Sequence, residues 1–360
     1  MAWEQVIILL LPLPLIIAAN IRVASAPEGS VRARLAPLAG SLTWLMLWVI
    51  AAGSALLGPY ELILGLISGR GASPGQVSFA IVMMTTGAVA LALLARSTRE
   101  LVARVLPIDP VNAVHTTALV LSIVLAGSQL ASQLAADVLA QQAQSGTALE
   151  PVDLVAQEVP FLLAALAGVG LGIRRSPGQA LRRLGLVRPT AWQVVLGLAA
   201  AGLFFAIGNG IDTLGHSLTP GVAGKVDAAN GRLFSRLGDP VGIATIALTA
   251  GICEEVLFRG ALQPRLGIIW PALVFAAIHT QYGLSLDSLA VFILATGLGL
   301  LRRVTNTTTT IVCHIAYDAL VGIGVAGVWL VPALVIEAAL LLGGLAAFLT
   351  GRLGSLRTAQ

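Results

Sequence analysis

The sequence predicts an all-α fold, a polytopic membrane helix bundle with about 11 transmembrane helices (range 9–12). Three observations predict it. Of the 360 residues, 57% are hydrophobic and only 11% are charged, whereas a soluble domain is usually about 25% charged. The mean hydropathy is +0.92. The apolar residues form solid blocks of about 20 residues, the length of a spanning helix, and not the alternating segments of a membrane β-barrel. A soluble enzyme and a disordered chain are both excluded.

Apolar blocks follow one another along the whole chain, and most of them are long enough to cross a bilayer. They cover residues 5–19, 35–57, 77–95, 113–134, 155–173, 191–212, 240–263, 267–283, 286–301, 305–327 and 329–350. Only one charged residue, Glu4, precedes the first block, so the basic start of a secretory signal is missing. We therefore expect the first block to remain in the membrane, with its N-terminus outside the cytoplasm.

The basic residues orient this bundle. With the N-terminus outside, 17 of the 21 Lys and Arg residues fall on one side, in alternate loops. The positive-inside rule assigns that side to the cytoplasm. Only Arg70, Lys225, Arg232 and Arg236 fall on the other side. We expect a cytoplasmic C-terminus, the lipid bilayer as surroundings and no nucleic acid as a partner.

Composition shifts divide the chain into four parts. Residues 1–173 form an N-terminal membrane-spanning region of unknown role. Residues 174–190 form a basic cytoplasmic segment, and residues 191–328 form a membrane core. Residues 329–360 form a final helix and a cytoplasmic tail.

Ionisable side chains inside spans are costly and mark functional sites; here they concentrate in the C-terminal half. In the motif Glu254-Glu255-x-x-x-Arg259, Glu255 and Arg259 are four residues apart. They therefore lie on one helix face, in the order that favours an ion pair. Neighbouring helical residues point about 100° apart, so Glu254 faces elsewhere, without a local counter-charge. A carboxylate in such a place can act as a general base or acid. The alternative is that both glutamates are buried ions that only support packing.

Two histidines follow in later spans. His279 ends an apolar block, while His314 and Asp318 are four residues apart on one helix face. At 1.5 Å rise per residue, Glu254, His279 and His314 all lie about 14–18 Å from the cytoplasmic ends of their spans. One carboxylate and two imidazoles at one depth predict a water-activating site, or a three-ligand metal site with an open position.

The motifs Glu254-Glu255-x-x-x-Arg259, Phe275-x-x-x-His279 and His314-x-x-x-Asp318 together resemble the motif set of the CPBP (Abi) family. This family contains the type II CAAX prenyl endopeptidases and bacterial intramembrane proteases. The resemblance covers roughly residues 180–325. It implies an intramembrane endopeptidase that hydrolyses a membrane-associated or lipid-modified peptide or protein substrate.

The resemblance also implies a role for each residue. Glu254 would be the base that activates water, and Glu255, held by Arg259, would support it. His279 would help to bind the water or a metal. His314, together with residue 318, would bind the metal or stabilise the oxyanion.

Asp318 departs from the family pattern, because many members carry Asn at this position. An ionised Asp cannot donate a hydrogen bond to an oxyanion, so it would have to be protonated or else orient His314. Two cofactor states stay open: one divalent metal such as zinc on Glu254, His279 and His314, or activated water without a metal.

Two other functions also stay open. A proton-coupled transporter would use buried carboxylates as relays, although transporters disperse such residues and here they cluster. A catalytically inactive member would act as a scaffold or immunity protein, although Glu254, His279 and His314 are all intact. For each function we expect a multi-pass protein of the bacterial plasma membrane.

Overall fold

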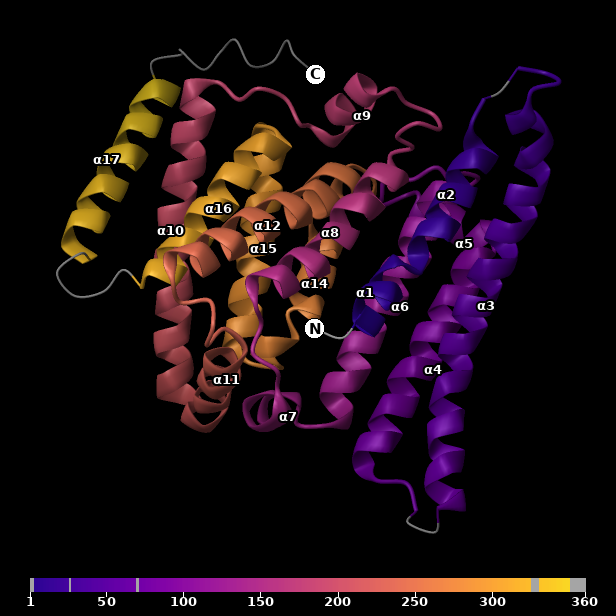
Figure 1. The fold of residues 1–360 in the computed structure, drawn as a ribbon, viewed down its shortest axis with the longest axis horizontal. Helices are drawn as coiled ribbons and strands as arrows, with labels where there is room; N and C mark the ends of the chain where they lie inside the picture. The colour runs from indigo at the N-terminus through magenta and orange to yellow at the C-terminus, as the bar shows by residue number, and fades with distance from the viewer. Residues whose placement is uncertain (1–2, 26, 69–70, 325–329, 350–360) are drawn as a thin grey trace.

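The structure, a computed structural model, describes residues 3–25, 27–68, 71–324 and 330–349. Every regular element in these ranges is a helix (Figure 1), which confirms the predicted all-α class. The α-helices are α1 Trp3–Leu10, α2 Pro12–Val23, α3 Val31–Ile67, α4 Pro74–Leu94, α5 Arg96–Val102, α6 Ala113–Ala135, α7 Val138–Ser145, α8 Pro151–Gly168, α9 Pro177–Leu184, α10 Ala191–Leu218, α11 Pro220–Leu233, α12 Pro240–Glu255, α13 Gln263–Leu266, α14 Ile269–Ile278, α15 Leu286–Val304, α16 Thr307–Ile323 and α17 Leu330–Leu349. A π-helix, η1 Val256–Leu262, joins α12 to α13, and a short 3₁₀ turn, η2 Thr280–Tyr282, follows α14.

The chain is a polytopic helical membrane protein, as its composition predicts. Among the described residues, seven helical runs are long and apolar enough to cross a membrane: Val6–Val23, Val31–Ile67, Pro74–Leu94, Ala113–Ala135, Pro151–Gly168, Ala191–Leu218 and Pro240–Leu266. The other four predicted blocks also contain helices. Two of these helices, α14 and α16, have only 10 and 17 residues, and α15 carries Arg302 and Arg303 in its last turn.

The helices form two groups, which α8 and the packing of α14 on α6 join. On one side of the molecule, α3 packs on α2 and α4, and α6 packs on α2 and α4 (right in Figure 1). On the other side, α16 packs on α10 and α12, and α15 packs on α10 and α14. α8 contacts α2 in the first group and α12 and η1 in the second. The N-terminal region therefore packs directly on the helix that carries the two glutamates.

Polar helices lie at opposite ends of the bundle. α7 and α11 lie together at the lower end in Figure 1, and α9 lies at the upper end. α9 belongs to the basic segment; it begins at a capping box of Ser176 and Gln179 and ends at Gly185, whose φ of 72° suits glycine. Arg183 of α9 donates a hydrogen bond to the carbonyl of Gly260, at 3.1 Å. The basic segment is thus tied to the end of η1.

A glycine lets α12 and α16 approach closely. A Cβ atom on Gly251 would lie 2.6 Å from Cγ1 of Ile315 and 3.1 Å from its backbone nitrogen. Gly251 lies about one turn before Glu254, and Ile315 directly follows His314. This helix contact therefore sets the separation between the glutamate and the histidine.

Replacing Gly251 by Val should destabilise the protein by about 1–3 kcal/mol, since overpacking forces backbone shifts. The measurement is the free energy of unfolding in detergent. Gly210→Val is the matched control, because Gly210 is also helical and a Cβ there meets nothing within 4 Å. Equal losses for the two variants would show that the close contact does not matter.

Candidate active site

The two glutamates lie where an α-helix changes into a π-helix. α12 ends at Glu255 and continues without a break as η1. The side chains of Glu254 and Glu255 are buried, with exposed fractions of 4% and 0% for the two residues. π-Helical segments are rare and are frequently found at functional sites. The π-helix was not predicted, because the hydrophobic pattern of Val256–Leu262 fits a regular α-helix equally well.

The predicted ion pair between Glu255 and Arg259 is confirmed. Nη1 of Arg259 donates to Oε1 of Glu255 at 2.7 Å, and Nη2 donates to the carbonyl of Ala295 at 3.1 Å. The guanidinium lies over the ring of Phe275, 4.6 Å from its centroid, in a cation–π contact. Arg259 was also among the 17 basic residues counted as cytoplasmic. The residue does not lie in a loop, because it falls within the helical run Pro240–Leu266 and is only 2% exposed.

Both histidines are fixed through Nδ1. Nδ1 of His314 lies 3.0 Å from Oε1 of Glu255, and Nδ1 of His279 lies 2.7 Å from the carbonyl oxygen of Phe275. Because both partners are acceptors, each Nδ1 is the donor. This leaves Nε2 of each imidazole available for chemistry, an arrangement typical of histidines that bind a metal or transfer a proton.

Glu254 lies between the two Nε2 atoms. Its Oε1 is 3.9 Å from Nε2 of His279, and its Oε2 is 3.8 Å from Nε2 of His314. On the other side of His314, Oδ2 of Asp318 lies 3.6 Å from the same Nε2. The structure therefore brings together all six residues singled out in the sequence. The separations around Glu254 are too long for direct hydrogen bonds.

A cavity of about 80 Å³ opens at this point, with His279, His314 and Asp318 in its lining. Aromatic rings, including those of Phe275 and Tyr282, form much of the rest. The volume and the polar lining suit a small number of water molecules. Oε2 of Glu254 is buried and has no hydrogen-bond partner among the described residues, so a water molecule or a cation would satisfy it.

The donor set of Glu254, His279 and His314 suits zinc, which binds imidazole nitrogen and carboxylate oxygen. The unpartnered Oε2 of Glu254 lies 3.8 Å from Nε2 of His314, whereas Nε2 of His279 lies 3.9 Å from the other carboxylate oxygen, Oε1. Within the described ranges, however, the three side chains whose ligand atoms all lie within 4.8 Å of one another are Asp212, His216 and Asp227. A metal on Glu254 stays a prediction.

Glu158 is a carboxylate that was not predicted. It lies on α8, in the N-terminal region, and its Oε2 is buried without a hydrogen-bond partner in the part of the chain that the structure describes. It interacts electrostatically with Glu254, His314 and Asp318. The signal was present in the sequence, because Glu158 is an ionisable residue inside an apolar block. Its relation to the site depends on α8 packing against α12, which the sequence does not reveal.

Fold and site together define a polytopic membrane protein with a buried cluster of Glu and His side chains. Residues 237–320 match the family described as type II CAAX prenyl endopeptidase Rce1-like. The chain thus carries a domain of this family, and the matched range contains all six predicted site residues. It is narrower than the predicted range of 180–325.

One curated relative matches part of the chain. The uncharacterized protein YpbD of Bacillus subtilis (strain 168) is 35% identical over 95 residues, which are 25% of this chain and 48% of the relative. The chain therefore spans about half the length of the curated relative that it matches. No solved structure matches the chain.

Replacing Arg259 by Met should destabilise the protein by about 3–5 kcal/mol, because the carboxylate of Glu255 would stay buried without its cation. The measurement is the free energy of unfolding in detergent. The double variant Arg259→Met, Glu255→Gln should recover part of the loss, since it removes both charges. Arg104→Met, at an exposed arginine, is the control. A double variant no more stable than the single one would contradict this account.

Proposed function

We propose that this protein is an intramembrane endopeptidase that hydrolyses a peptide bond of a membrane-associated or lipid-modified substrate. The observation that carries the proposal is the position of Glu254, whose two carboxylate oxygens each face an imidazole Nε2 beside the cavity. Membership of a family of CAAX prenyl endopeptidases supports a peptide substrate. A buried, clustered site fits hydrolysis better than a relay of dispersed carboxylates across a membrane.

In the proposed reaction, Glu254 accepts a proton from a water molecule in the cavity. The water oxygen attacks the carbonyl carbon of the substrate, and a tetrahedral intermediate forms. Glu254 then gives the proton to the leaving nitrogen as the C–N bond breaks, so that one water is consumed and an acid and an amine are released. Transfer of the same proton in and out is general base and then general acid catalysis. No covalent acyl-enzyme is formed.

His314 is the group proposed to stabilise the oxyanion. When both of its nitrogens carry a proton, Nδ1 donates to Glu255 and Nε2 is free to donate to the developing negative charge. Asp318, whose Oδ2 lies 3.6 Å from Nε2, is proposed to orient the imidazole before the substrate carbonyl occupies the site, a role that does not require the hydrogen-bond donor of the family's Asn. A divalent metal held by Glu254, His279 and His314 would add Lewis acid activation of the substrate carbonyl and of water.

The proposed topology has eleven spans, an N-terminus outside the cytoplasm and a cytoplasmic C-terminus. The separation of α9 from α7 and α11, at opposite ends of the bundle, supports it (Figure 1). So does the distribution of Arg and Lys, because the positive-inside rule places α9 in the cytoplasm. The substrate would enter from that side. The similarity to a Bacillus subtilis protein supports a location in the bacterial plasma membrane.

Replacing Glu254 by Gln should lower kcat by about 10²–10⁴-fold, because the amide cannot accept the proton of water. The assay is cleavage of a fluorogenic lipid-modified peptide by the purified full-length chain in detergent. Glu100→Gln, at an exposed ion pair with Arg96, should keep full activity. Equal rates for wild type and Glu254→Gln would overturn the site, and metal analysis of both proteins would test the metal prediction.

Asp318→Asn should keep kcat within about tenfold of wild type, because an amide oxygen can take the place of the carboxylate beside His314. Asp318→Leu should lose about 10–100-fold, as expected when the partner of a catalytic imidazole is removed. The comparison is of kcat and KM across pH. Identical pH profiles for Asp318→Asn and wild type would show that the charge of Asp318 does not act on His314.

A further inference from the structure

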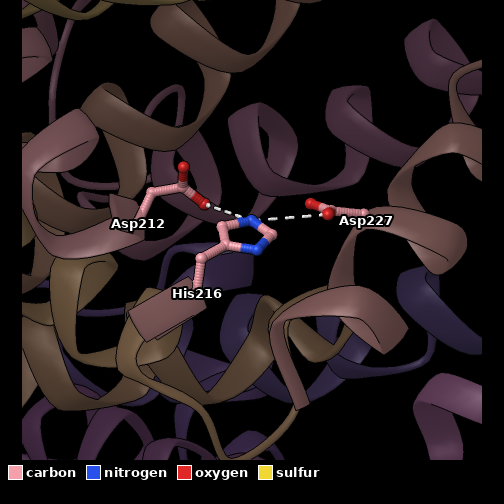
Figure 2. A group of neighbouring side chains, drawn as sticks. All are labelled: Asp212, His216 and Asp227. Carbon is pink, nitrogen blue, oxygen red and sulfur yellow. Dashed lines mark ion pairs between the residues drawn. The ribbon is translucent and has the colours of Figure 1, made fainter. Parts of the chain in front are cut away.

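A second group of ligand-type side chains lies away from the candidate active site. Asp212 and His216 lie in the last two turns of α10, and Asp227 lies in the middle of α11. Figure 2 shows the imidazole between the two carboxylates. Nε2 of His216 is 3.6 Å from Oδ1 of Asp212 and 3.4 Å from Oδ2 of Asp227. In the described part of the chain, this is the group of three whose ligand atoms lie within 4.8 Å of one another.

The distances suit a shared metal ion better than direct contacts. Nε2 forms no hydrogen bond with either carboxylate among the described residues. Ligand atoms on a tetrahedral zinc ion, with bonds of about 2.0–2.2 Å, lie about 3.3–3.6 Å apart. The two measured separations from Nε2 fall at that spacing. One imidazole and two carboxylates form a three-ligand set of the type that zinc accepts.

Within the described ranges, neither carboxylate pairs with a cation other than the imidazole. Among the described ion pairs, Asp212 and Asp227 each pair with His216, while the nearby Lys225 pairs with Asp137 of the turn before α7. That amine donates to Asp137 and holds the pKa of its carboxyl below the usual range. Lys225 is therefore engaged elsewhere, and two acidic groups share one imidazole.

The helix that carries Asp227 has a low intrinsic helix propensity. α11 contains Gly221, Gly224 and Gly231, and a Cβ at each would meet nothing within 4 Å. These glycines are thus not required by close packing, and each weakens a helix by about 1 kcal/mol relative to Ala. A helix of 14 residues with this composition depends on contacts outside itself. A metal ion would fasten its middle to the end of α10.

α11 also covers the active site from one end. Val226 and Ala229 of α11 are buried against Leu139 of α7, and Tyr282 packs against this cluster. Tyr282 in turn stacks on His279, with ring centroids 6.3 Å apart. Tyr282 therefore contacts both the cluster between α7 and α11 and a histidine that faces Glu254.

We propose that Asp212, His216 and Asp227 bind one divalent transition-metal ion of the zinc class, which holds α11 against α10. The site is distinct from the candidate active site, and the proposal does not depend on peptidase activity. Its role is structural: the bound ion keeps the cover formed by α7 and α11 closed over Tyr282. Water would complete the coordination, since all three side chains are partly exposed.

A single lysine makes the test specific. Lys225 is the only lysine in the chain and lies inside α11, so a lysine-specific endoprotease cuts the protein only when this helix opens. With Zn²⁺ at 100 times its Kd, opening and therefore cleavage should slow by about 100-fold. His216→Ala and Asp227→Asn should each be cut at the same rate with and without zinc. Because zinc would slow the cleavage of these variants too if it inhibited the protease, they also control for that inhibition. His115→Ala, at a histidine that accepts a hydrogen bond from the backbone of Asp109, should be protected like wild type.

Binding is measured in parallel, by equilibrium dialysis of the full chain against Zn²⁺ and metal analysis. His216→Ala and Asp227→Asn should each bind one equivalent fewer than wild type, and Glu254→Gln should keep that equivalent. Because Glu254→Gln leaves this site intact, loss of peptidase activity and loss of zinc at α11 are separate results. Equal zinc content in wild type and His216→Ala, or equal protection by Ca²⁺, would overturn the proposal and leave His216 as an ion-pair partner of the two aspartates.

Discussion

Oε1 of Glu255 accepts hydrogen bonds from two side chains that belong to different helices. It accepts from Nη1 of Arg259 at 2.7 Å and from Nδ1 of His314 at 3.0 Å. A buried charge of this kind is tolerated only when it is paired and hydrogen-bonded. The arginine therefore has to lie within reach of α12, and the imidazole has to come from α16. The orientation of His314, its distance to Glu254 and the shape of the cavity all depend on this one carboxylate oxygen.

The surrounding helices make that arrangement possible. Gly251 lets α16 approach α12. The carbonyl oxygen of Ala295 on α15 accepts a hydrogen bond from Nη2 of Arg259. α8 closes the other side of α12 and adds Glu158 to the same electrostatic environment. The N-terminal region is thus more than an anchor in the bilayer, because it supplies one wall around the glutamates although it lies outside the matched family range.

Much of this could be predicted from the sequence. The apolar blocks predict the helices, because burial in lipid leaves few alternatives to a helix. The spacing of four residues predicts the contacts of Glu255 with Arg259 and of His314 with Asp318. Contacts between distant helices could not be predicted: the approach of α8 to α12 and the position of Asp227 beside His216 depend on tertiary packing. The π-helix escaped prediction as well, since its residues also satisfy an α-helical pattern.

The π-helix has a consequence for changes in chain length. Its backbone bonds run from residue i to i+5 instead of i+4, so Val256–Leu262 resembles an α-helix that holds one inserted residue. Deleting one residue there would leave a continuous helix between α12 and α13. The guanidinium at position 259, however, would lose the register that lets it reach Glu255 and Ala295 together. The length of this segment is therefore as much a requirement of the site as the identity of its side chains.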